Sequence, residues 1–102
     1  MSQPIYLLTI GLGLRIVGIL QPATAGVPYV GLLYGYRGVE PYSWSLSSKS
    51  GAFPSGLSLS TDSSGNGVIS GTPATAGTTD VIITVTDATG LSVSRTVRIV
   101  VL

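Results

Sequence analysis

Hydrophobic and polar residues alternate along most of this chain with the period of two that is typical of β-strands. The pattern is clearest in residues 41–46, PYSWSL, where Tyr42, Trp44 and Leu46 alternate with serines. An indole ring buries on the order of 200 Å². The alternation therefore predicts that Trp44 lies in the core on a central strand. The alternative is an exposed tryptophan that stacks on a ligand.

Similar apolar runs follow at residues 27–36, 57–60, 68–72, 80–86 and 91–102, separated by turn signals such as Asn66-Gly67. Short strands at this spacing, without a helical pattern, predict a single all-β domain: an antiparallel β-sandwich of immunoglobulin (Ig) type with about 7–8 strands. Arg95 interrupts the last apolar face, so we expect it near a strand end, where it reaches water. The predicted core consists of Tyr29, Leu33, Tyr42, Trp44, Leu46, Leu57, Ile69, Ile83, Val85, Val97 and Ile99.

The apolar run of residues 5–20 has three possible interpretations: a signal peptide, a membrane span or a strand. Residues 23–25, ATA, have the form of a cleavage site, but the first residues carry no Lys or Arg and Arg15 interrupts the run. The motif PATAG, moreover, occurs at residues 22–26 and again at 73–77, each time before a strand-like run, which favours a turn. We therefore expect a strand or arm over residues 1–16, outside a sandwich domain of residues 17–102.

Two apolar faces are candidate interfaces. The first lies on the N-terminal strand and consists of Leu8, Ile10, Leu12 and Leu14. The second lies on residues 27–36, where both faces of the strand are apolar, so that Leu32, Tyr34 and Tyr36 are either covered or await a partner. For these three residues, contact with a protein partner and solvent exposure without a partner are both expected alternatives. A platform that stacks on sugar rings is a further alternative and would consist of Tyr29, Tyr34, Tyr36 and Tyr42, although core packing is the expected role of Tyr29 and Tyr42.

Composition excludes several classes of function. The chain has 102 residues, of which only 9% are charged, with a net charge of +1, so it lacks the clustered cations that nucleic-acid binding requires. Histidine and cysteine are absent, which excludes a Ser-His-Asp triad, a thiolate nucleophile and a His-ligated metal. Asp62, Asp80 and Asp87 are isolated from one another, whereas Ca²⁺ needs several oxygen ligands. We expect Asp62 and Asp87 to support turns, and no catalytic residue, metal or cofactor.

Five motifs occur in a characteristic order: GVPY at residues 26–29, PYSWSL at 41–46, FPSGLSL at 53–59, GVISGTP at 67–73 and VTD at 85–87. Together they resemble the putative Ig domain of bacterial haemagglutinin-like surface proteins and phage structural proteins, over about residues 17–102. The resemblance implies an Ig-like or cadherin-like sandwich that serves adhesion, spacing or assembly, without catalysis.

These observations predict a non-enzymatic structural module that binds through apolar and main-chain contacts. Because the chain lacks a convincing export signal and a linker to a further domain, we expect a phage virion accessory protein, such as a capsid decoration (cement) protein. The expected partners are other copies of itself or a larger virion protein such as the major capsid protein, with no nucleic acid and no membrane involved. The alternative is a carbohydrate-binding or adhesion module at a bacterial cell surface or secreted from the cell.

Overall fold

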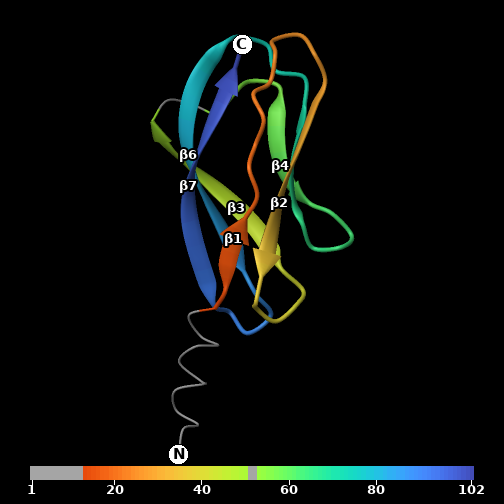
Figure 1. Cartoon of the computed structure of the whole chain (residues 1–102), viewed down its shortest axis with the longest axis vertical. Helices are drawn as coiled ribbons and strands as arrows, with labels where there is room; N and C mark the ends of the chain where they lie inside the picture. Colours follow the sequence, from red (N-terminus) through yellow and green to blue (C-terminus); the bar gives the residue numbers. More distant parts are fainter. Residues whose placement is uncertain (1–12, 51–52) are drawn as a thin grey trace, which may run out of the picture.

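The computed structural model describes residues 13–50 and 53–102, which form seven strands in two antiparallel sheets (Figure 1). The strands are β1 (Arg15–Val17), β2 (Tyr29–Tyr36), β3 (Ser43–Ser50), β4 (Leu57–Thr61), β5 (Gly67–Gly71), β6 (Gly77–Thr86) and β7 (Ser92–Val101). One sheet has the strand order β1-β2-β5-β4 and the other β3-β6-β7. This is the arrangement of a constant-type Ig sandwich, so the predicted fold class is confirmed.

The core lies between the two sheets and is built from alternate residues of nearly every strand. Of the predicted core, Leu33, Tyr42, Leu57, Ile69, Ile83, Val85, Val97 and Ile99 are buried, and Tyr29, Trp44 and Leu46 are half-buried against them. Further buried positions are Leu14, Ile16, Ala23, Val81 and Val101. The indole of Trp44 also donates a hydrogen bond from Nε1 to the Gly65 carbonyl oxygen at 2.8 Å.

Glycines on the inward face of β2 and β5 make room for large side chains of the opposite sheet. A Cβ at Gly35 would lie 2.9 Å from the Tyr42 ring, and one at Gly67 would lie 2.7 Å from the Trp44 ring. Both distances are shorter than real carbon contacts allow. These glycines therefore set how closely the two sheets approach each other at the aromatic positions.

The N-terminal part of the structure corrects one prediction. Leu14 is only 3% exposed and packs in the core of the chain itself, so its side chain is not available as part of an interface. Leu8, Ile10 and Leu12 lie outside the described residues. β1 covers Arg15–Val17, so the boundary expected between residues 16 and 17 falls inside a strand.

After β1 the chain crosses to the other sheet and pairs with the end of β7. The Ala23 N–H donates to the Val100 carbonyl at 2.8 Å, the Leu102 N–H donates to the Ala23 carbonyl at 2.7 Å, and the Ala25 N–H donates to the Leu102 carbonyl at 2.9 Å. Ala23 and Val101 form a parallel bridge. The first PATAG segment thus covers part of an edge that would otherwise be open to other strands.

Arg95 lies inside β7 rather than near its end, which differs from the prediction. Its side chain stays exposed because β7 is an edge strand of its sheet. From there Nη1 donates to the carbonyl oxygen of Ile16 on β1 at 3.4 Å. The arginine thereby bridges the two sheets across the open side of the sandwich.

Candidate functional site

Two of the four carboxylates of the chain are committed to turns, as predicted. Asp62 Oδ1 accepts the N–H groups of Ser64 and Asn66, both at 2.9 Å. Asp87 Oδ1 accepts the N–H of Thr89 at 2.9 Å, its hydroxyl at 2.6 Å and the N–H of Leu91 at 3.1 Å. Hydrogen bonds to the charged form hold the pKa of both carboxyl groups below the usual value, chiefly those from the Asn66 backbone to Asp62 and from the Thr89 side chain to Asp87.

The other two acidic residues, Asp80 and Glu40, lie on different elements of the fold. Asp80 makes an ion pair with Arg98 at 2.9 Å on the outward face of the β3-β6-β7 sheet, and Glu40 is exposed in the β2–β3 loop. Within residues 13–50 and 53–102, no group of three potential metal ligands occurs. The same residues include no helix of membrane-spanning length and apolarity.

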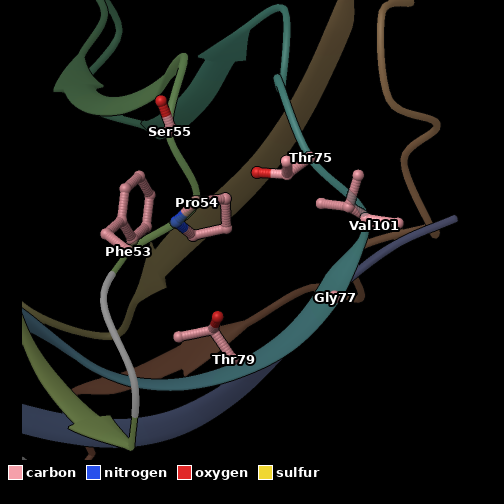
Figure 2. A pocket seen from close by; sticks show the side chains of 8 residues that line it. Phe53, Pro54, Ser55, Thr75, Gly77, Thr79 and Val101 are labelled. Atoms are coloured by element: carbon pink, nitrogen blue, oxygen red, sulfur yellow. The ribbon is translucent and has the colours of Figure 1, made fainter.

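A cavity of about 240 Å³ lies near the start of β6, between the loop that precedes β4 and the end of β7 (Figure 2). Phe53 and Pro54 line one side, and Thr75, Thr79 and Val101 lie opposite. Among the described residues that line it, the only polar side chains are the hydroxyls of Ser55, Thr75 and Thr79. Ligand pockets generally have a volume of about 300–1,000 Å³ and contain a few charged or polar groups that point toward the ligand. This cavity is smaller and has no charged group among its described residues, so it offers little basis for specific binding.

A second hollow of about 280 Å³ lies where the β2–β3 loop meets the β4–β5 turn. It is lined by Glu40, Pro41, Ser63, Ser64 and Gly65. A single carboxylate beside two serines is a weak basis for recognition of a ligand. Neither of these two hollows therefore identifies a binding site.

The outward face of the β1-β2-β5-β4 sheet is the most distinctive surface. Along β2, Val30 is 69% exposed, Leu32 37%, Tyr34 40% and Tyr36 52%. Val17 of β1 pairs with Tyr34, and Val68 of β5 pairs with Leu32. These six side chains, which we call the apolar face, lie on one side of the sheet because paired residues share a face. The structure thus places all three predicted interface residues of β2 together.

The outward face of the β3-β6-β7 sheet has the opposite character. It presents serines at alternate positions of β3 and hydroxyl pairs across β6 and β7, of which Thr84–Ser94 and Thr86–Ser92 are each separated by 2.7 Å. Soluble monomers usually expose apolar residues singly, and a contiguous apolar patch indicates a contact surface. The contrast between the two faces of one sandwich therefore points to the apolar face as the candidate interface.

Two arginines border the apolar face at its Tyr36 end, and sequence reasoning did not find them. Arg15 pairs directly with Tyr36 in the β1–β2 register, and the Arg37 guanidinium lies over the Tyr36 ring at 5.6 Å from its centroid. Cation–π contact of this kind is favourable at the surface. In the sequence, Arg15 only interrupts the N-terminal apolar run, because its place beside Tyr36 depends on the strand register.

Comparison with known proteins agrees with this fold. The family profile described as "Putative Ig domain" matches residues 17–102. No curated protein sequence matches the chain. Among solved structures, part of a putative alpha-galactosidase from Bacteroides fragilis is similar, with a TM-score of 0.68, 23% identity and coverage of 88% of this chain. Part of an endo-fucoidan hydrolase of glycoside hydrolase family 107 gives a TM-score of 0.56 and 24% identity over 84% of the chain. This chain corresponds to only 18% and 13% of those proteins, so the likeness concerns the fold alone.

Proposed function

Because the chain belongs to the putative Ig domain family, we propose that it is a non-catalytic assembly module that binds a protein partner through its apolar face. The observation that carries this proposal is the exposure of Val30, Leu32, Tyr34 and Tyr36 along a single strand. Burial of this apolar surface against a partner releases about 25 cal/mol per Å². Tyrosine in particular is enriched in the centres of protein interfaces.

The size of the apolar face argues for a larger partner or for many copies. An eight-residue strand is about 26 Å long and neighbouring strands are about 4.8 Å apart, so the four-stranded face measures on the order of 500 Å². A standard interface buries about 800 Å² on each partner. A second surface must therefore contribute, or several weak contacts must act together. Leu8, Ile10 and Leu12, which lie outside the described residues, remain the predicted second surface.

Repeated weak contacts of this kind suit a particle that presents many identical sites. We therefore propose, more specifically, that the chain is a phage virion accessory protein, such as a capsid decoration protein, and that it binds a larger virion protein such as the major capsid protein. Its support is the need for a multivalent partner and the resemblance of the five sequence motifs to modules of phage structural proteins.

A photo-crosslinking amino acid in place of Leu32 tests the proposal, either in the cells that produce the protein or in particles that contain it. We expect one dominant crosslinked protein, identified by mass spectrometry, and far less crosslinking when the same group replaces Ser94. Ser94 is the matched control because it is an exposed strand residue on the other outward face. Equal crosslinking from both positions would show that the apolar face has no dedicated partner. If the crosslinked protein is a virion protein, the proposed role as a virion accessory protein is supported. If it is a cellular protein, that role is excluded.

A carbohydrate-binding module is the second candidate, favoured by the two exposed tyrosines. Tyr34 and Tyr36 are two residues apart on one face, which separates them by about 7 Å and allows both rings to contact one oligosaccharide. The two similar structures are also parts of proteins named as an alpha-galactosidase and an endo-fucoidan hydrolase. Binding on a glycan array that is lost in Tyr36→Ala would favour this candidate. Absence of any glycan signal would exclude it for the glycans on the array.

A further inference from the structure

We infer that the protein surface that docks on the apolar face presents carboxylates to Arg15 and Arg37. This inference rests on the proposed function and names the chemistry of the partner. It concerns one end of the apolar face, where β1 and the end of β2 lie side by side (Figure 1).

The two arginines and Tyr36 form one cluster. Arg15 and Tyr36 are directly paired across β1 and β2, so both side chains leave the sheet on the outward side. Arg37 follows Tyr36 in the chain, and its guanidinium lies 5.6 Å from the centre of that ring. All three side chains are exposed. An aromatic ring with flanking guanidinium groups is the composition that dominates binding energy in many protein interfaces.

Three of the four acidic side chains have partners of their own, and the fourth, Glu40, is exposed in the β2–β3 loop and makes no ion pair with either arginine among the described residues. The outward positions of β1, β2, β4 and β5 carry apolar side chains, serines and Arg15, but no Asp or Glu. Asp80 pairs with Arg98 on the opposite face, and Asp62 and Asp87 accept hydrogen bonds from turn residues. Complementary charge for Arg15 and Arg37 would therefore come from a partner, and Arg binds carboxylates well because its fork can engage both oxygens.

The backbone at Arg37 gives an independent reason to assign its side chain a role. Its φ is +69°, a left-handed conformation that glycine adopts freely and a residue with a Cβ adopts at a cost. A glycine would relieve this strain, yet the chain has arginine there and places glycine one residue later, at Gly38. Strain of this kind tends to persist where the side chain serves a function.

The remainder of the surface favours a polypeptide over an anionic polysaccharide. Between the arginines and the far end of β2 the exposed side chains are mostly aliphatic, namely Val17, Val30 and Leu32. Aliphatic side chains fit apolar protein surface, whereas sugars need hydrogen-bonding groups placed among the aromatic rings. We therefore expect an acidic protein segment that also carries apolar or aromatic residues.

A random copolymer of glutamate and tyrosine is a suitable probe, compared with polyglutamate, polylysine and dextran sulfate in a binding assay at low and physiological salt. We expect the full chain to bind the copolymer more tightly than polyglutamate, and polylysine not at all. Arg37→Gly should weaken copolymer binding roughly tenfold while its melting temperature stays equal to or above that of the parent. Arg98→Ala removes the same charge from the opposite face and should leave binding unchanged.

Each other outcome overturns the inference in a distinguishable way. Suppose that Arg37→Gly binds the copolymer as tightly as the parent, whereas Leu32→Glu does not bind it. The apolar face would then still be an interface, but the arginines would have no role in binding. If Arg37→Gly and Leu32→Glu both bind the copolymer as tightly as the parent, the copolymer does not bind the apolar face and the inference is wrong, while crosslinking from Leu32 still tests the proposed function by itself. Arginine-dependent binding to dextran sulfate without binding to the copolymer would assign the cluster to an anionic polysaccharide instead.

Discussion

Asp87 connects two loops through one buried carboxylate. Besides its bonds within the β6–β7 turn, its Oδ2 accepts the N–H of Val39 in the β2–β3 loop at 3.2 Å. The Ala88 N–H donates to the Val39 carbonyl at 2.8 Å beside it. A single ionised group thus holds the end of the sandwich from which the Tyr36–Arg37 cluster emerges.

We expect the stability conferred by Asp87 to depend on pH. Hydrogen bonds, first that of the Thr89 side chain, hold its folded pKa below the unfolded value of about 3.8, so the stabilisation is complete above that value and is lost as pH falls through the folded pKa. The melting temperature of Asp87→Asn should therefore be lower than that of the parent at pH 7, and the difference between the two melting temperatures should decrease below about pH 4. Thermal melts from pH 2 to 7 measure this. Glu40→Gln, at an exposed position, is the control, and a difference independent of pH would contradict the assignment.

Gly67 offers a second prediction at the residue scale. A methyl group there meets the Trp44 ring at 2.7 Å, so Gly67→Ala should lower the free energy of unfolding by about 1–3 kcal/mol through overpacking. The cost should be smaller in a Trp44→Leu background, because the smaller side chain leaves room. Denaturant unfolding of the four proteins of this double-mutant cycle measures the coupling. Additive effects would mean that the ring does not limit the approach of the sheets.

At the scale of elements, the segment around Ala23 is the critical cover of the β7 edge. Ala23→Pro removes the N–H that donates to Val100 and should cost about 1–3 kcal/mol in unfolding free energy. The exposed edge should also increase aggregation at high concentration. Thr24→Ala, next to it and exposed, keeps the N–H and should change stability by less than about 0.5 kcal/mol. Chemical denaturation and light scattering are the measurements, and equal behaviour of the two variants would contradict the role of this pairing.

The alternation of apolar and polar residues predicted the strands well, but it does not show which surface the apolar face of each strand packs against. The pattern placed Leu14 on an apolar face, yet the same pattern suits a face that packs on its own domain and one that packs on a neighbour. The packing of Trp44 against the core was predictable because a large apolar ring in a strict alternation is usually buried, but the central strand expected for it was wrong, since β3 is an edge strand of its sheet. Arg15 and Arg37 were not, because their convergence on Tyr36 depends on the β1–β2 register and on a left-handed residue in a turn.

At the scale of the whole molecule, the position of Leu14 changes how an N-terminal deletion must be designed. Removal of residues 1–14 takes a buried leucine from the core, so loss of assembly in that variant would not separate docking from unfolding. Leu14→Ala alone should lower the free energy of unfolding by about 2–5 kcal/mol. Denaturant unfolding of this variant and of chains that begin at residue 13 or residue 15 measures the difference. Equal stability of the two truncated chains would show that Leu14 is dispensable.

The parallel pairing of Ala23 with the end of β7 also determines how the module responds to force. Figure 1 shows β1 entering at one end of the sandwich and the C-terminus leaving at the other. A pull along the long axis therefore loads the three hydrogen bonds of this pairing in shear, so that they must break together rather than one after another. We expect a distinct unfolding peak in single-molecule stretching, reduced in Ala23→Pro. The same pairing that covers a strand edge would then also set the mechanical strength of the domain.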